Sequence, residues 1–112
     1  MNPELEATLT KLKDTNALID PVEVIKLIEE VGGWIDDLDL EVVELQEKAD
    51  AKWAELYQSH YGDWTMAELN NGYRISEDYK NMKRQSVLLR RLRRHYRLLN
   101  TKLNLLTKPK GR

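Results

Sequence analysis

The sequence contains no cysteine and no phenylalanine, and it has only 5 glycines and 3 prolines among 112 residues. Without cysteine, a disulfide scaffold, a thiolate zinc site and a thiol nucleophile are all excluded. There is also no apolar run of the roughly 18 residues that a membrane-spanning helix needs. Met1 is followed by Asn2-Pro3-Glu4 rather than by a basic and then apolar stretch. We therefore expect a cytoplasmic protein of one small domain, with no secretory signal and no membrane association.

Apolar residues recur at helical spacing along most of the chain, and this pattern predicts an all-α protein. Asn2-Pro3 and Asp20-Pro21 each place a capping side chain before a proline at the first helical position. Helices are therefore expected to begin at residues 3 and 21. Gly32-Gly33 is expected to end the second of them. Two short N-terminal helices are the prediction for residues 1–33.

Two longer helices are expected in residues 34–106, joined by a turn at Gly62-Asp63. The apolar residues of the first, up to His60, alternate in steps of three and four. The second begins with the capping box of residues 65–68, has a candidate restart at Ser76, and continues to about residue 106. The expected architecture is an antiparallel, coiled-coil-like helical hairpin, with residues 1–106 forming one helical domain. A second copy would cover the surface that such long arms leave open, so we expect a dimer.

A net charge of −1 conceals a strong segregation of charge along the chain. Residues 1–60 hold 15 acidic and 5 basic side chains, a balance of −10, whereas residues 61–112 hold 4 acidic and 13 basic ones, a balance of +9. The tail of residues 107–112 is basic and is expected to be disordered. Such an asymmetry indicates a partner of opposite charge, inside or outside the molecule.

The densest basic stretch lies in the second long helix. Its candidate contact residues are Lys83, Arg84, Arg90, Arg91, Arg93, Arg94, Arg97 and Lys102. Arginine dominates it, and the guanidinium fork matches two phosphate oxygens at once, which favours nucleic acid or an acidic protein surface. The alternative is that these bases pair with the acidic helix of the same chain or of a dimer partner.

A second set of candidates combines the acidic stretch with aromatic residues near the turn. It consists of Asp36, Asp37, Glu41, Glu44, Glu47, Tyr57, Tyr61 and Trp64. These residues would bind a host protein, such as a nuclease, either as a hot spot or by imitating the phosphates of a duplex. The alternative is that the carboxylates form a solvated or ion-paired face and the aromatics form a small core that closes the turn.

An enzymatic interpretation rests on carboxylates alone. Small all-α, Mg²⁺-dependent nucleotide pyrophosphohydrolases carry Glu-Glu-x-x-Glu and a later Glu-x-x-Asp. Here Glu29-Glu30 is followed by glycine where the third glutamate belongs, although residues 47–50 fit the second element. His60 and His95 have no local metal-binding partner. We expect no metal, no cofactor and no catalytic activity.

The second predicted arm carries the pattern Tyr-x-x-x-Lys-Arg over residues 79–84, followed by the arginine-rich residues 90–97. With these features, the short, cysteine-free hairpin of residues 34–106 resembles small helical accessory proteins of bacteriophages and prophages. The resemblance implies a role in DNA recombination, or inhibition of a host nuclease or defence system through a dimeric coiled coil. It concerns architecture, so no site residue is carried over from it.

The sequence thus predicts a non-enzymatic binding or regulatory protein associated with nucleic acid, whose basic helix contacts phosphates or an acidic partner. The alternative is an inhibitor or adaptor that binds a host protein through the acidic helix and the aromatic turn.

Overall fold

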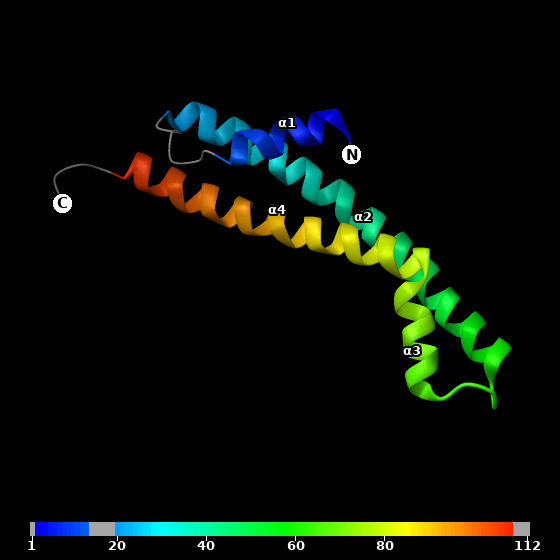
Figure 1. Cartoon of the computed structure of the whole chain (residues 1–112). Coiled ribbons are helices and arrows are strands. Elements are labelled where there is room, and N and C mark those ends of the chain that lie inside the picture. The colour runs from blue at the N-terminus through cyan, green and yellow to red at the C-terminus, as the bar shows by residue number, and fades with distance from the viewer. Residues whose placement is uncertain (1, 14–19, 109–112) are drawn as a thin grey trace. The chain divides into compact units, whose positions relative to one another are not determined.

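A computed structural model describes residues 2–13 and 20–108 of the chain. Its helices are α1 (Pro3–Leu12), α2 (Pro21–His60), α3 (Met66–Ile75) and α4 (Glu77–Thr107) (Figure 1). The described ranges contain no strand, so the all-α prediction is confirmed. No helix in them is long and apolar enough to cross a membrane. Most of the predicted disordered tail, residues 109–112, lies outside the described residues.

The predicted helix starts are confirmed by their capping hydrogen bonds. The side chain of Asn2 accepts a hydrogen bond from the Glu4 N–H at 2.8 Å. That of Asp20 accepts one from the Val22 N–H at 3.0 Å. The capping box of residues 65–68 is present with both of its hydrogen bonds, and the Ser76 hydroxyl accepts from the backbone N–H three residues on, at the start of α4. Each cap satisfies a donor that the first helical turn leaves without a partner.

The predicted helix end at Gly32-Gly33 is wrong, because α2 runs without interruption from Pro21 to His60. In the part of the chain that the structure describes, one short helix, α1, precedes α2, and the second predicted helix is the beginning of α2. Glycine inside a helix costs about 1 kcal/mol relative to alanine. Here the neighbouring turns bury Val31 completely and Leu38 almost completely. Burial of such side chains contributes about 1.5–3 kcal/mol each, which is enough to carry the helix across both glycines.

The glycine that does end a helix is Gly62. It has φ of 85°, the left-handed conformation that glycine adopts without steric cost, and it lies two residues after His60, the last residue of α2. The backbone N–H groups of Asp63 and Trp64 both donate to the carbonyl oxygen of His60, at 3.0 and 3.1 Å. The predicted turn between the two segments is therefore present, and it leads directly into α3.

The chain divides into two compact units, and each is described separately. Unit 1 combines residues up to 37 with those from 90 onward, and therefore contains α1, the first part of α2 and the last part of α4. Its buried apolar side chains are Leu5, Leu12, Val24, Leu27, Val31, Leu92 and Leu99. Unit 2 comprises residues 38–89, with the rest of α2, all of α3 and the start of α4. Its buried apolar side chains are Leu38, Ala49, Leu69, Met82 and Leu89.

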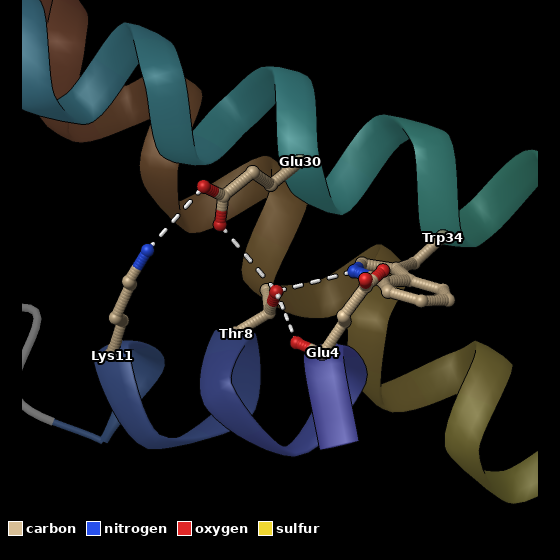
Figure 2. Close-up of polar contacts among 5 residues, drawn as sticks. All are labelled: Glu4, Thr8, Lys11, Glu30 and Trp34. Atoms are coloured by element: carbon tan, nitrogen blue, oxygen red, sulfur yellow. Dashed lines mark hydrogen bonds and ion pairs between the residues drawn. The ribbon is translucent and has the colours of Figure 1, made fainter. Parts of the chain in front are cut away.

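In unit 1, α1 is attached to α2 by a polar contact around Thr8 (Figure 2). The Thr8 hydroxyl, which is 3% exposed, accepts a hydrogen bond from the indole N–H of Trp34 at 3.1 Å. Its own proton reaches either the Glu4 carbonyl oxygen at 3.2 Å or the Glu30 carboxylate at 3.4 Å. Lys11 pairs with the other carboxylate oxygen of Glu30 at 3.3 Å. A buried polar group thus has partners on both helices, which sets the position of α1.

In unit 2, half-buried aromatic rings from three helices pack together. Tyr73 on α3 lies 5.7 Å from Trp53 and 4.8 Å from Tyr79 between ring centroids, in edge-to-face arrangements. His60 and Trp64 stack in parallel at 3.6 Å. A Cβ at Gly72 would lie 2.9 Å from the Trp64 ring, so the glycine inside α3 makes room for this indole.

Candidate functional site

Unit 1 contains an open groove between α2 and α4, with a volume of about 590 Å³. Its lining residues are Gly32, Ile35 and Asp36 from α2, and Arg90, Arg93, Tyr96 and Arg97 from α4. Apolar groups and three guanidinium groups therefore meet in one groove, together with a single carboxylate. Such a combination suits a ligand that has both an apolar part and a negative charge.

Tyr96 provides the large apolar surface of this groove, and more than a third of the residue is exposed. The heptad pattern places Tyr96 in the seam with Leu92 and Leu99, which are fully buried, but 38% of Tyr96 is exposed. The reason lies across the groove on α2. A Cβ at Gly32 would come within 3.6 Å of Cε2 of the Tyr96 ring, so the ring lies against a residue that has no side chain to cover it.

The arginines of α4 in unit 1 form an exposed basic surface. Arg90, Arg91, Arg94 and Arg97 are all exposed, and none of the described carboxylates forms an ion pair with them. Arg93 is exposed as well, but it already takes part in an interaction within the protein, so it is left out of this surface. The ion pairs of Lys11 with Glu30 and Lys52 with Glu55 involve other helices. These four arginines therefore keep their charge uncompensated by the described carboxylates.

The spacing of these arginines places three of them close together on α4. Arg90, Arg94 and Arg97 follow one another by four and three residues, so they fall on the same side of the helix. From Arg90 to Arg97 the helix rises by about 10 Å, and along one strand of a duplex that length holds about three phosphates. Arg90 and Arg97 also line the groove, and Arg94 lies between them in sequence.

The ionisation of His95 reports the positive field of this surface. His95 is half-buried, and its pKa is lowered from the ordinary value of 6.5 by burial, and then by the charges of Arg94 and Arg91. Both causes disfavour the protonated ring, so His95 is neutral at pH 7. Burial and the two neighbouring guanidinium groups therefore act on the pKa of the ring in the same direction.

The remaining basic candidates are divided between the units. Lys83 and Arg84 are exposed in unit 2, while Lys102 is half-buried in unit 1. The structure therefore brings together the arginines of residues 90–97 and leaves the other three bases outside the groove.

The acidic and aromatic candidates are divided in the same way. Asp36 and Asp37 belong to unit 1, and the other members of that set belong to unit 2. In unit 2, Tyr57 and Tyr61 are 43% and 75% exposed, with ring centroids 5.6 Å apart. Trp64 is instead half-buried against His60. The expectation of a small aromatic core therefore fits Trp64, whereas the two tyrosines face solvent.

Three groove residues are not among the site residues that the sequence predicts, namely Gly32, Ile35 and Tyr96. Local propensity marks Gly32 as a helix end, and periodicity marks Ile35 and Tyr96 as seam positions. No local signal indicates that the three lie in one groove. Among the described residues, no three histidine or carboxylate side chains come together as metal ligands would. Comparisons with protein-family models, with curated proteins and with solved structures found no match to this chain.

Proposed function

We propose that the protein is a non-enzymatic binding protein for nucleic acid, and that the arginine face of α4 contacts the phosphate backbone. The arginine face is defined as Arg90, Arg91, Arg94 and Arg97. The observation that supports this most is that all four are exposed and that no described carboxylate pairs with them. An arginine cluster that served internal pairing would have its guanidinium groups matched by carboxylates.

The expected recognition is largely independent of base sequence. Guanidinium groups on one helix face bind phosphate oxygens in a bidentate manner and release the counterions condensed on the nucleic acid. Such contacts set affinity and position, whereas sequence is read by contacts to base edges. A regulatory or accessory role, in which the protein coats or holds nucleic acid, follows from this kind of binding.

Fluorescence anisotropy with a labelled oligonucleotide tests the proposal. We expect the anisotropy to rise and saturate as protein is added at low salt, because three or more phosphate contacts then have their full strength. Labelled single strands and labelled duplexes are titrated in parallel, with a neutral peptide nucleic acid of the same sequence as the control. Absence of binding to both charged probes at low salt would reject the proposal.

The pKa of His95 should rise when nucleic acid binds. Arg94 and Arg91 contribute to the lowered pKa of the free protein, so phosphates that neutralise them remove part of the lowering. By linkage, affinity should increase as pH falls through the titration range of His95, because the protonated ring adds a positive charge. NMR titration of the ring protons, assigned with His95→Gln, measures this. A pKa that stays unchanged at saturation would show that the phosphates bind elsewhere.

Binding of a protein partner is a second candidate function, and it is favoured by the exposed tyrosine pair of unit 2. Tyr57 and Tyr61 present two neighbouring rings to solvent, and exposed tyrosines of this kind are frequent energetic centres of interfaces. The acidic residues of the same part of α2, including Glu44 and Glu47, would complement a basic surface on such a partner. This is the inhibitor or adaptor interpretation.

The proposal also includes the antiparallel hairpin, the dimer and the cytoplasmic location that the sequence predicts. The dimer is supported by Leu40 and Val43 of α2, which are 70% and 58% exposed. Exposed branched apolar side chains three residues apart lie on one helix face and favour contact with another apolar surface.

A further inference from the structure

The groove of unit 1 has an apolar surface beside its arginines, and binding of phosphate by the arginine face does not require such a surface. Tyr96, Ile35 and the backbone at Gly32 provide an apolar surface within it. Arg90 and Arg97, which are exposed, provide the positive charge along α4. A ligand that fits both must carry a flat or apolar group next to an anion, and a nucleotide has this composition.

The carboxylate of Asp36 indicates which part of a nucleotide enters the groove. Asp36 is exposed, lines the groove and has no ion pair with any described residue. A carboxylate repels phosphate, but it accepts hydrogen bonds from the amino groups of bases. The phosphates are therefore expected on the arginine face, and the base is expected beside Tyr96 and Asp36.

We infer that the groove binds an unstacked base of single-stranded nucleic acid, with the base against the Tyr96 ring and the adjoining phosphates on Arg90 and Arg97. This inference rests on the proposed function and specifies its ligand. In a duplex the faces of the bases are stacked on one another and cannot reach a protein ring, whereas a single strand can turn a base outward. The protein should therefore bind single strands more tightly than duplexes of equal length.

The replacement Tyr96→Leu tests this inference, because it keeps an apolar side chain but removes the aromatic face. Loss of one base–aromatic stack should weaken single-strand binding roughly tenfold and leave duplex binding within about twofold of the wild type. The matched control is Tyr61→Leu, which removes an exposed tyrosine from unit 2 and should leave both affinities unchanged. Thermal melting of each variant establishes that it is folded.

A second pair of variants tests the groove without replacing Tyr96. Gly32→Leu places an apolar side chain where the Tyr96 ring now lies against backbone, whereas a Cβ at Gly33 meets no atom within 4 Å. Both replacements remove a helix-destabilising glycine, so neither is expected to unfold α2. Gly32→Leu should reduce single-strand affinity severalfold, and Gly33→Leu should not.

The outcomes separate this inference from the function on which it rests. If Tyr96→Leu and Gly32→Leu both bind single strands as the wild type does, the groove is not the base site, although the arginine face still binds phosphates. If the wild type favours duplexes, the inference is likewise overturned. If the wild type binds neither form, the proposed function fails and the inference fails with it. Loss of single-strand preference in both groove variants, with both controls unaffected, supports the base site.

Discussion

Replacing Arg90, Arg94 and Arg97 together with glutamate is expected to lower affinity for a labelled single strand roughly a hundredfold or more at low salt. Each replacement removes a charge-assisted hydrogen bond to phosphate, which contributes about 1.5–3 kcal/mol, and adds a repelling carboxylate. All three side chains are exposed, so the change should leave the packing of α4 intact. Anisotropy titrations of the wild type and the variant, at one salt concentration, give the ratio of the two affinities.

A control must distinguish the effect of the protein's net charge on affinity from the effect of charge at the arginine face. The matched control reverses Lys26, Lys48 and Arg74, which are exposed and lie outside the groove and the arginine face. It changes the net charge by the same amount. We expect the control to weaken binding only modestly, through the long-range field. If both triple variants lose affinity equally, the nucleic acid responds to net charge, and the arginine face has no special role.

The same reversals also test the alternative of internal pairing. If the arginines of residues 90–97 stabilised the fold by pairing with the acidic part of α2, replacement with glutamate would lower the melting temperature. Because Arg90, Arg94 and Arg97 have no ion pair with described carboxylates, we expect the melting temperature to stay close to that of the wild type. Exposed charges of this kind contribute little to stability.

Truncation of Leu99 to alanine is expected to lower the free energy of unfolding by about 2–5 kcal/mol. Leu99 is fully buried in unit 1, where α1, α2 and α4 come together, and removing its branched end leaves a cavity. Such a loss is a large part of the stability of a small domain. Urea unfolding, followed by the fluorescence of the tryptophans, measures the change.

The neighbouring residue supplies the control for this prediction. Leu98 is 53% exposed, so Leu98→Ala should change the free energy of unfolding by less than about 1 kcal/mol. The two variants have the same composition and lie on the same turn of α4. Equal destabilisation by both would contradict the burial that separates them, and with it the orientation of α4 on which the exposure of Arg94 and Arg97 depends.

The sequence predicts the helix starts well because capping is local chemistry. Asn2, Asp20 and Thr65 each hydrogen-bond an N–H group two or three residues away, so the signal and the structure occupy the same short segment. The left-handed glycine after α2 is predictable for the same reason, because the terminating residue itself carries the signal.

The error at Gly32-Gly33 and the overlooked groove have one cause. Local propensity favours a helix end at two glycines, but burial of residues on either side of them decides the outcome, and burial depends on parts of the chain that are distant in sequence. The heptad pattern likewise places Tyr96 in the seam. Its exposure depends on which residue of α2 lies opposite, and that residue is Gly32. Sequence periodicity gives the face of a helix but not the residue across from it.

The candidate arginines were identified from sequence, whereas the exposure of each had to come from the structure. Periodicity places Arg90, Arg94 and Arg97 on one side of a helix, but it does not show whether a carboxylate from elsewhere in the fold reaches them. The structure shows none among the described residues for these three, and shows an interaction for Arg93. A contact surface can therefore be assigned only after the arginines that interact within the protein are distinguished from those that do not.

The dependence of affinity on salt tests the central claim most directly, because it measures the number of phosphate contacts without any mutation. For a single strand that loses its counterions at three phosphates, a plot of log Kobs against log salt concentration should be linear, with a slope of about −2. The R90E/R94E/R97E variant should give a slope close to zero. A wild-type slope near zero, or an unchanged slope in the variant, would contradict binding of phosphates by the arginine face of α4.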